Sequence, residues 1–278
     1  MLLINSIMKN YYKLDNQQET LNKGSSETTR RTTFNFDLLL WFIGFLEVDG
    51  SFIFSNKRYF FIITQNELIV LFKIKHFLKL GRVQKHGKYF RFIITKSNDF
   101  YFLINLISPY LVLFKTVSKI NSCLKYTNYK NLNLKKFDFF KNAWLSGFID
   151  SEGCFYVRLV KREKYILGYQ IRLLFILDQK LLDNDVIFFD YLKLAIGGSI
   201  VNRKNNNFRL IIESNDDILK LIDYLKRYPL RSHKKTIQFK HWLICWRIKN
   251  KKEKTIQDIE KIKKIKSWRY SPPKYESI

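Results

Sequence analysis

Apolar residues follow two different periods along this chain, and the same succession of periods occurs twice. Leu38, Trp41, Phe42, Phe45 and Val48 recur at the three- and four-residue spacing of an amphipathic helix. Segments in which every second residue is apolar come next, as expected of strands with one buried face. The pattern predicts strands at 51–58, 59–65, 154–161 and 169–178, hairpins at 82–95 and 199–213, and helices at 67–80 and 184–195.

One acidic turn is present in two copies. Trp41 precedes the sequence FIGFLEVDGSF, and Trp144 precedes LSGFIDSEGCF. In both, a glycine stands third in an apolar run that ends in acid-x-acid-Gly. Further matches keep the same order at a slowly growing offset: 61–65 with 175–179, 81–83 with 198–200, 90–94 with 208–212, and 97–99 with 214–216. Such collinear matches indicate a duplicated unit of the form α-β-β-α-β-β-α.

The duplication predicts an α+β fold with two pseudo-twofold units, each with a four-stranded antiparallel sheet, and with the motif helices at the interface. The segment before the first repeat is polar and aperiodic. A charged helix at 249–266 is expected to present a solvated face. The expected divisions are a disordered leader (1–33), a first repeat (34–125), a linker (126–136), a second repeat (137–250) and a basic C-terminal tail (251–278).

Charge narrows the class of partner. The chain has 50 Lys and Arg against 24 Asp and Glu, a formal net charge of +26. This excess favours nucleic acid before an anionic membrane as partner, although A/T-rich codons also enrich lysine. The 3 cysteines have no paired spacing, which argues against a disulfide framework or a zinc cluster. No apolar run reaches the ~20 residues of a membrane span.

The duplicated acids suggest a metal site. A glycine within a helix costs roughly 0.5–1 kcal/mol relative to alanine, so Gly44 and Gly147 need a reason. Two helices that approach each other at these glycines would bring Asp49 and Glu152 together. Carboxylates forced together repel unless a cation lies between them, and oxygen-only ligands favour Mg²⁺. The alternative is that each acidic turn only ends a helix.

Both motifs resemble the nine-residue signature of the LAGLIDADG homing endonucleases, and their duplication resembles the single-chain, two-motif branch. The resemblance covers roughly residues 34–250. It implies that Asp49 and Glu152 are the metal-binding catalytic carboxylates. It also implies roles for six neighbours: metal contacts by the backbone carbonyls of Val48 and Ser151, and helix-interface positions for Gly44, Gly147, Glu47 and Asp150.

The resemblance implies further polar residues around each acid. Gln65 and Gln179 match the strand-end glutamine that orients water, with an ordinary surface amide as the alternative. A basic residue near the start of each half's last helix would offset negative charge in the transition state. Lys119 is chosen in the first half, with Lys115 as its rival. Lys234 is chosen in the second half, with Lys235 as its rival.

The strands are expected to bind DNA. A two-stranded ribbon fits the major groove, where alternate side chains reach base edges. Counting by twos selects a basic saddle of Ser55, Lys57, Arg58, Arg82, Gln84, His86 and Arg91 in the first half, and of Arg158, Arg162, Gln170, Arg172, Asp178, Ser199, Arg203 and Arg209 in the second. The alternative for each residue alone is a solvated sheet face.

These observations together predict a monomeric, site-specific double-strand DNA endonuclease that hydrolyses phosphodiester bonds with Mg²⁺ (or Mn²⁺) and promotes intron mobility. The resemblance and the codon usage place it in the mitochondrion. The alternative is an intron-encoded maturase that binds its host intron RNA. A transcriptional regulator derived from the same fold is a third hypothesis. Acids at both Asp49 and Glu152, together with both Gln65 and Gln179, favour the nuclease, because RNA binding alone does not need them.

Overall fold

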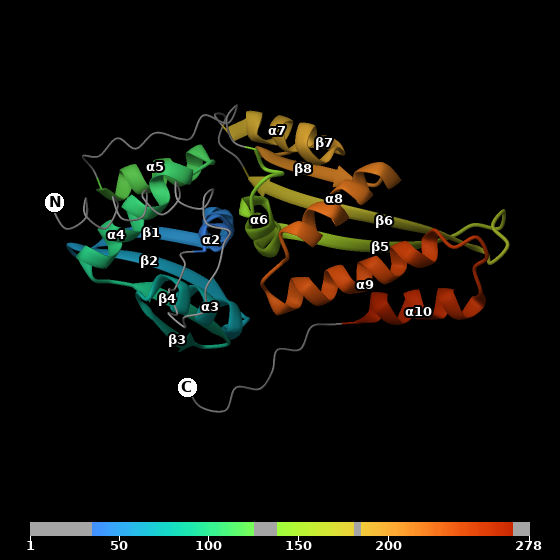
Figure 1. The fold of residues 1–278 in the computed structure, drawn as a ribbon, viewed down its shortest axis with the longest axis horizontal. Coiled ribbons are helices and arrows are strands. Elements are labelled where there is room, and N and C mark those ends of the chain that lie inside the picture. The colour runs from blue at the N-terminus through green and yellow to red at the C-terminus, as the bar shows by residue number, and fades with distance from the viewer. Residues whose placement is uncertain (1–34, 125–137, 181–184, 269–278) are drawn as a thin grey trace, which may run out of the picture. The chain divides into compact units, whose positions relative to one another are not determined.

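The computed structural model describes residues 35–124, 138–180 and 185–268 of the 278-residue chain (Figure 1). The expected leader, the expected linker and the last part of the expected tail, 269–278, lie outside the described residues.

The first half follows the predicted order of elements and adds one helix. It consists of α2 (Phe36–Asp49), β1 (Gly50–Ser55), β2 (Arg58–Gln65), α3 (Leu68–Leu78), β3 (Arg82–His86), β4 (Tyr89–Ile94), α4 (Ser97–Ile107), a 3₁₀ turn (Ser108–Tyr110) and α5 (Phe114–Leu124). Proline disfavours helical geometry in the residue before it, and Pro109 lies in the 3₁₀ turn that separates α4 from α5. The additional helix α5 therefore results from a break that the periodicity alone did not reveal.

The second half repeats this order. It consists of α6 (Trp144–Glu152), β5 (Gly153–Lys161), β6 (Tyr169–Lys180), α7 (Val186–Ile196), β7 (Ser199–Arg203), β8 (Asn207–Ile212), α8 (Asn215–Arg227), α9 (His233–Lys249) and a final helix α10 (Ile256–Ser267). Pro229 again lies between the two helices that close the unit, α8 and α9.

The two sheets have the same topology, with strand orders β1-β2-β4-β3 and β5-β6-β8-β7. Their registers are equivalent, since Phe61 pairs with Ile94 in one sheet and Phe175 pairs with Ile212 in the other. The predicted α+β fold with duplicated units and two four-stranded antiparallel sheets is confirmed.

The first hairpin differs in detail from its prediction. The first strand ends at Ser55 rather than at residue 58, and Ser55 pairs directly with Arg58. Asn56 and Lys57 form the two-residue turn with φ values of 49° and 59°. A turn with positive φ at both central residues matches the twist of the strands that it connects. Lys57 is thus a turn residue.

Each sheet has one buried face. In β2 the side chains of Phe61 and Ile63 are fully buried, and in β6 those of Phe175 and Leu177 are their counterparts. The residues between them are more exposed and point to the opposite face of the sheet, because side chains alternate along a strand. The helices therefore cover one face of each sheet and leave the other open.

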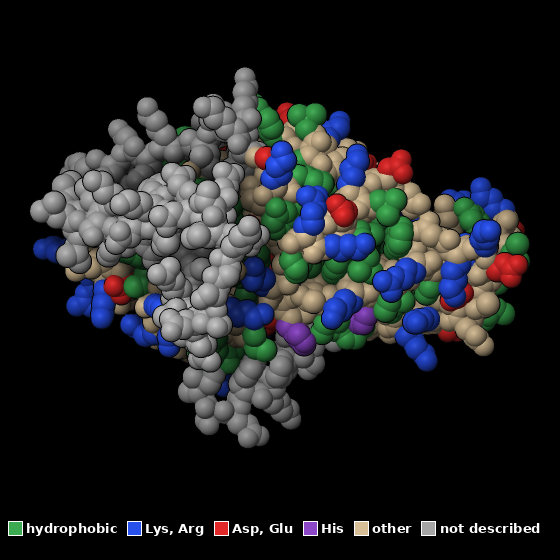
Figure 2. All heavy atoms as spheres, in the orientation of Figure 1, with side chains coloured by type: hydrophobic (Ala, Val, Ile, Leu, Met, Phe, Trp, Pro, Cys, Tyr) green, Lys and Arg blue, Asp and Glu red, His purple; other side chains and the backbone are tan. Residues whose placement is uncertain are grey.

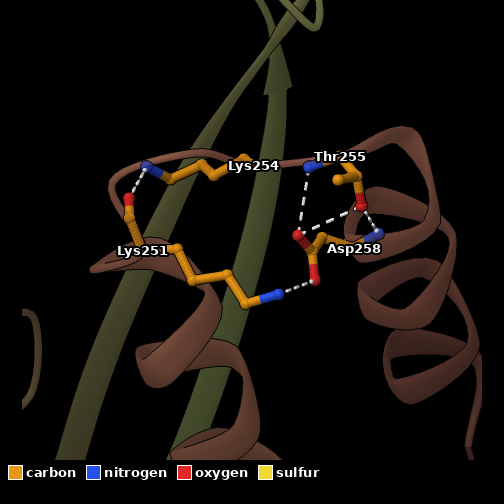
Figure 3. A network of polar contacts seen from close by, with 4 residues as sticks. All are labelled: Lys251, Lys254, Thr255 and Asp258. Atoms are coloured by element: carbon orange, nitrogen blue, oxygen red, sulfur yellow. Dashed lines mark hydrogen bonds and ion pairs between the residues drawn. The ribbon is translucent and has the colours of Figure 1, made fainter.

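The segment expected as a solvated charged tail is helical from Ile256 but is not solvated all round. Ile259 and Ile262 of α10 are buried, and α10 packs on α9. Figure 3 shows how the helix begins: Thr255 and Asp258 cap each other reciprocally, and the Nζ of Lys251 lies 2.7 Å from Oδ1 of Asp258. The solvated-face expectation therefore applies to only one side of α10.

Positive charge is distributed over the folded surface. Figure 2 shows Lys and Arg side chains interspersed with apolar and acidic ones across the face that carries α8, α9 and α10. Among the helices that the structure describes, none has the length and apolar character needed to cross a membrane.

Candidate active site

Helices α2 and α6 meet backbone to backbone at the two motif glycines. A Cβ atom placed on Gly44 would overlap the carbonyl oxygen of Trp144, and one on Gly147 would overlap that of Trp41. Only glycine permits such an approach. The contact is reciprocal, since each glycine lies against the tryptophan that begins the other motif. The sequence reasoning about the mid-helix glycines agrees with this geometry.

The acids at the sixth motif position bind across this contact. Glu47 accepts a 3.0 Å hydrogen bond from Nε1 of Trp144, and Asp150 accepts one of 2.8 Å from Nε1 of Trp41. Both carboxyl groups are almost fully buried. Burial raises the pKa of Glu47 to about 8 and that of Asp150 to about 6, against the lowering effect of their hydrogen bonds. These acids brace the helix pair, as expected.

The same two acids connect the helix pair to the starts of α5 and α9. Glu47 accepts from the backbone N–H groups of Val112 and Leu113, just before α5. Asp150 accepts from those of Arg231 and Ser232, just before α9. Each sixth-position acid therefore fixes the start of a helix as well as the contact between α2 and α6.

Asp49 and Glu152 lie at the C-terminal ends of α2 and α6, near enough to interact. Oδ2 of Asp49 accepts hydrogen bonds from Nε2 of Gln65, at 2.6 Å, and from the hydroxyl of Ser151 in the other motif. Burial raises the pKa of Asp49 above its usual range. Burial, followed by the charge of Asp49, raises the pKa of Glu152. The structure thus brings the two distant acids to one place.

This arrangement fits a divalent cation. Two partly buried carboxylates resist ionisation, and the negative ends of two helix dipoles add to the unfavourable potential. A cation between Asp49 and Glu152 would relieve both effects. The described residues contain no group of three or more His, Cys, Asp and Glu side chains arranged for a metal. Mg²⁺ suits such a sparse site, because it commonly uses one or two carboxylates together with water and substrate phosphate.

The seventh motif residues, Val48 and Ser151, differ in what they offer. Both side chains are half-buried. The hydroxyl of Ser151 donates to Asp49, which valine could not do in return. Metal contacts through the backbone carbonyls of these two residues stay a prediction.

Two lysines lie close enough to the acid pair to change its pKa values. They are Lys115 and Lys235, the alternatives to the lysines chosen from the sequence. The charges of Lys235 and Lys115 lower the pKa values of both Asp49 and Glu152. Nζ of Lys235 donates to the carbonyl oxygen of Gly153, next to Glu152. Burial and the neighbouring charge of Lys119 lower the pKa of Lys115 to about 8.

The lysines chosen from the sequence, Lys119 and Lys234, are neighbours of Lys115 and Lys235. Lys119 is exposed, and its charge lowers the pKa of Lys115. In the same way, the charge of Lys234 lowers the pKa of Lys235. The geometry favours Lys115 and Lys235 as the basic residues of the site.

The two glutamines, matched in sequence, are not matched in contacts. Gln65 bonds Asp49, whereas Nε2 of Gln179 donates to its neighbour, the carbonyl oxygen of Lys180, at 3.3 Å. Oε1 of Gln179 is buried and accepts no hydrogen bond within the described residues. Only the first half therefore shows the glutamine–acid contact.

The predicted DNA-contact residues on strands share the open face of their sheets. Alternation along each strand places them opposite the buried side chains: Ser55, Arg58, Arg82, Gln84, His86 and Arg91 on the first sheet, and Arg158, Gln170, Arg172, Asp178, Ser199, Arg203 and Arg209 on the second. Lys57 and Arg162 lie in hairpin connections instead. The two open faces present most of the predicted basic surface.

Sequence reasoning missed two carboxylates that join the halves. Glu67, just before α3, accepts from the backbone N–H groups of His233 and Lys234 at the start of α9. Asp185, just before α7, accepts from those of Phe114 and Lys115 at the start of α5. Both side chains are buried. An acid in the first two residues of a predicted helix in each copy was the available signal.

Comparison with known proteins supports the family resemblance. The family model described as LAGLIDADG endonuclease matches residues 145–246. A Neurospora crassa protein described as probable intron-encoded endonuclease 4 is 30% identical over 220 residues, which cover 75% of this chain and 39% of that protein. The chain thus spans well under half of this relative's length.

Two further matches cover a larger share of the matched protein. An uncharacterized 37.2 kDa protein of cox1 intron 2 in Schizosaccharomyces pombe is 28% identical over 280 residues, which cover 90% of this chain and 83% of that protein. The structure of I-SmaMI bound to an uncleaved DNA target in the presence of calcium ions superposes with a TM-score of 0.67 at 21% identity, covering 82% of this chain and 97% of that one. At this identity the superposition shows a common fold. With two copies of the motif, paired helices and these matches, the chain belongs to the LAGLIDADG endonuclease family.

Proposed function

We propose that this protein is a site-specific double-strand DNA endonuclease that hydrolyses phosphodiester bonds with Mg²⁺ and promotes the movement of its host intron. The observation that carries this proposal is the meeting of Asp49 and Glu152 beside two lysines at the contact of α2 and α6. A purely structural helix pair needs no such cluster of raised-pKa carboxylates and partly buried cations.

The residues divide the work in the following way. Asp49 and Glu152 would hold the metal, and the bound ion would activate a water and stabilise the leaving oxygen. Gln65 fixes one carboxylate oxygen of Asp49. Lys115 and Lys235 would offset the charge that accumulates on the phosphate as the bond breaks. With one acid at the end of each motif helix, each would serve one DNA strand.

Binding is assigned to the open faces of the two sheets. Their arginines and glutamines match the donors that read guanine and adenine in the major groove. The I-SmaMI structure holds a DNA target in the presence of calcium ions, which supports DNA and a divalent cation as partners of this fold. Because both motif copies lie in one chain, we expect the protein to act as a monomer.

The cox1 intron that encodes the Schizosaccharomyces pombe relative supports a mitochondrial location and an intron-linked role for this chain. The host gene would then be the natural source of the target. The intact junction of the two exons that flank the intron should contain the cleavage site.

The test uses a plasmid that carries this exon junction, with Mg²⁺ and the purified full chain. We expect one double-strand cut for the wild type and none for the Asp49→Asn plus Glu152→Gln variant, which keeps the shape of both side chains. Binding by this variant, measured by gel shift, should persist and serves as its folding control. Failure of the wild type to cut, together with tight binding of the intron transcript, would replace the endonuclease with a maturase.

A further inference from the structure

We propose that the two sheets contact DNA in chemically different ways: the second selects bases through arginines held by carboxylates, and the first attracts phosphates through unpaired arginines. This inference rests on the proposed DNA-binding function. It assigns Asp178 and Glu213 as positioning residues for base selection, acting through Arg209 and Arg172.

The second sheet carries two bidentate ion pairs on its open face. Nε and Nη2 of Arg172 lie 2.6 and 2.7 Å from the two carboxylate oxygens of Glu213. The same two nitrogens of Arg209 lie 2.5 Å from the two carboxylate oxygens of Asp178. Such fork-to-fork pairs fix the plane of the guanidinium as well as its position.

The first sheet has the arginines without the acids. The equivalent registers align the pair Asp178–Arg209 with the pair Thr64–Arg91. The same alignment of the two copies makes Arg58 the equivalent of Arg172. One threonine thus stands where the second sheet has an aspartate.

The second acid is also replaced by a threonine. Glu213 directly follows β8, and Thr95 directly follows β4 at the corresponding place. Within the described residues no carboxylate pairs with Arg58 or Arg91, and Nε of Arg91 is buried without a hydrogen-bond partner. The two copies have therefore diverged at both acid positions in the same direction.

These differences change what each surface can recognise. An unpaired guanidinium brings a full positive charge, and phosphate contacts by such charges dominate sequence-independent, salt-dependent binding. A paired guanidinium adds little net charge but keeps unused donors in a fixed orientation, because both pairs leave Nη1 outside the fork. Fixed donors suit the edge of guanine, and a neighbouring carboxylate can accept from cytosine.

The pair Asp178–Arg209 lies close to the proposed metal-binding acid Glu152. Asp178 directly follows Leu177, which pairs with Gly153, and Gly153 is the residue after Glu152. Selection by Arg209 would therefore concern base pairs close to the bond that is cut. Arg172 lies nearer the start of β6, further from Glu152, and would contact base pairs further from the bond that is cut.

The experiment exchanges the residues that differ. Asp178→Thr plus Glu213→Thr gives the second sheet the residues of the first, and Thr64→Asp plus Thr95→Glu does the reverse. The full-length chain is used to select binders from a randomised duplex DNA library in EDTA, and the selected pools are sequenced. Binding to one fixed random-sequence duplex is then measured between 50 and 200 mM salt.

We expect the second-sheet exchange to lower base preference in one half-site by about tenfold per affected position, the size of one bidentate base contact. The slope of log affinity against log salt should steepen by about 2, near one for each freed guanidinium. The reverse exchange should make the slope shallower by a similar amount and leave the preferences of the other half-site in place.

The outcomes separate the inference from the function on which it rests. A wild type that enriches no sequence would contradict the proposed site-specific function. A wild type that enriches a site, with both exchanges keeping its base preferences and salt slope, would overturn the inference alone. Asp178→Asn plus Glu213→Gln retains side-chain shape but removes the charge and one acceptor of each ion pair, so its base preferences and salt slope decide the question if the threonine variant fails to fold.

Discussion

The two acidic turns have the same backbone setting but different surroundings. Asp49 receives hydrogen bonds from Gln65 and Ser151. No hydrogen bond from a described residue reaches the carboxylate of Glu152, and its expected partner Gln179 bonds a backbone carbonyl instead. Duplication has thus kept the contact between the helices while the polar contacts around each acid have diverged. Geometry set by backbone packing is harder to change than a hydrogen bond set by one side chain.

The largest effect should come from breaking the helix contact that both turns share. In Gly147→Ala the new methyl group would overlap the Trp41 carbonyl, and backbone cannot move aside as a flexible side chain can. We expect a loss of about 3 kcal/mol in unfolding free energy, measured by urea denaturation, with loss of cutting on both strands.

Gly87→Ala is the matched control for this change. Gly87 lies in a hairpin turn with φ near 60° and open space around its Cβ position. Its replacement should cost only about 1 kcal/mol through backbone strain and leave cutting intact. Equal losses for the two variants would show that the helix contact tolerates a methyl group.

Replacement of each lysine should show which of them contribute to catalysis beside the two acids. We expect Lys235→Met and Lys115→Met each to slow cutting by about 10²-fold, as when one donor to a developing charge is removed. Lys234→Met and Lys119→Met should slow it by less than about 10-fold. Single-turnover cleavage rates provide the measurement, and the opposite ranking would return the role to the sequence-based choices.

The pH dependence follows from the same cluster. Asp49 and Glu152 must be ionised to hold a cation, and their raised pKa values move the loss of activity on acidification to a higher pH than ordinary carboxyl groups would give. Lys115 loses its charge as the pH rises through about 8, so the rate should fall there. Lys115→Arg stays charged and should hold its rate above pH 8; an unchanged alkaline fall would assign it to another group.

The smallest expected effect tests whether the different hydrogen bonds of Asp49 and Glu152 lead to different cleavage rates of the two DNA strands. Ser151→Ala removes one donor to Asp49, a loss of about 1 kcal/mol or roughly fivefold in rate. If each acid serves one strand, this slowing should fall mainly on one of them and increase the nicked intermediate of a supercoiled plasmid. Val48→Ala removes only apolar atoms and is the control. Equal slowing of both strands would mean that the acids work as one unit.

The sequence predicted the elements that depend on local pattern and duplication. The two sheets, their hairpins and the glycine contact follow from alternating residues and from Gly44 and Gly147. The bounds of helices α5 and α9 were not predicted, although Lys119 and Lys234 were expected near the start of the last helix of each half.

Helix rotation explains why the sequence alone could not decide between neighbouring lysines. Adjacent helical residues such as Lys234 and Lys235 point about 100° apart, so the exact rotation of α9 decides which one reaches Glu152. That rotation is set by long-range contacts with Glu67 and Asp150, which no local pattern contains. Ion pairs such as Arg172–Glu213 likewise require the register of strands distant in sequence.

The crossed carboxylates Glu67 and Asp185 have a consequence for recombining such proteins. Each half supplies the anchor for the helix that delivers the other half's lysine. A hybrid built from halves of two relatives would therefore inherit a complete acid pair yet could misplace its cations. Modular exchange of target specificity should succeed where these anchors travel with the helices that they hold.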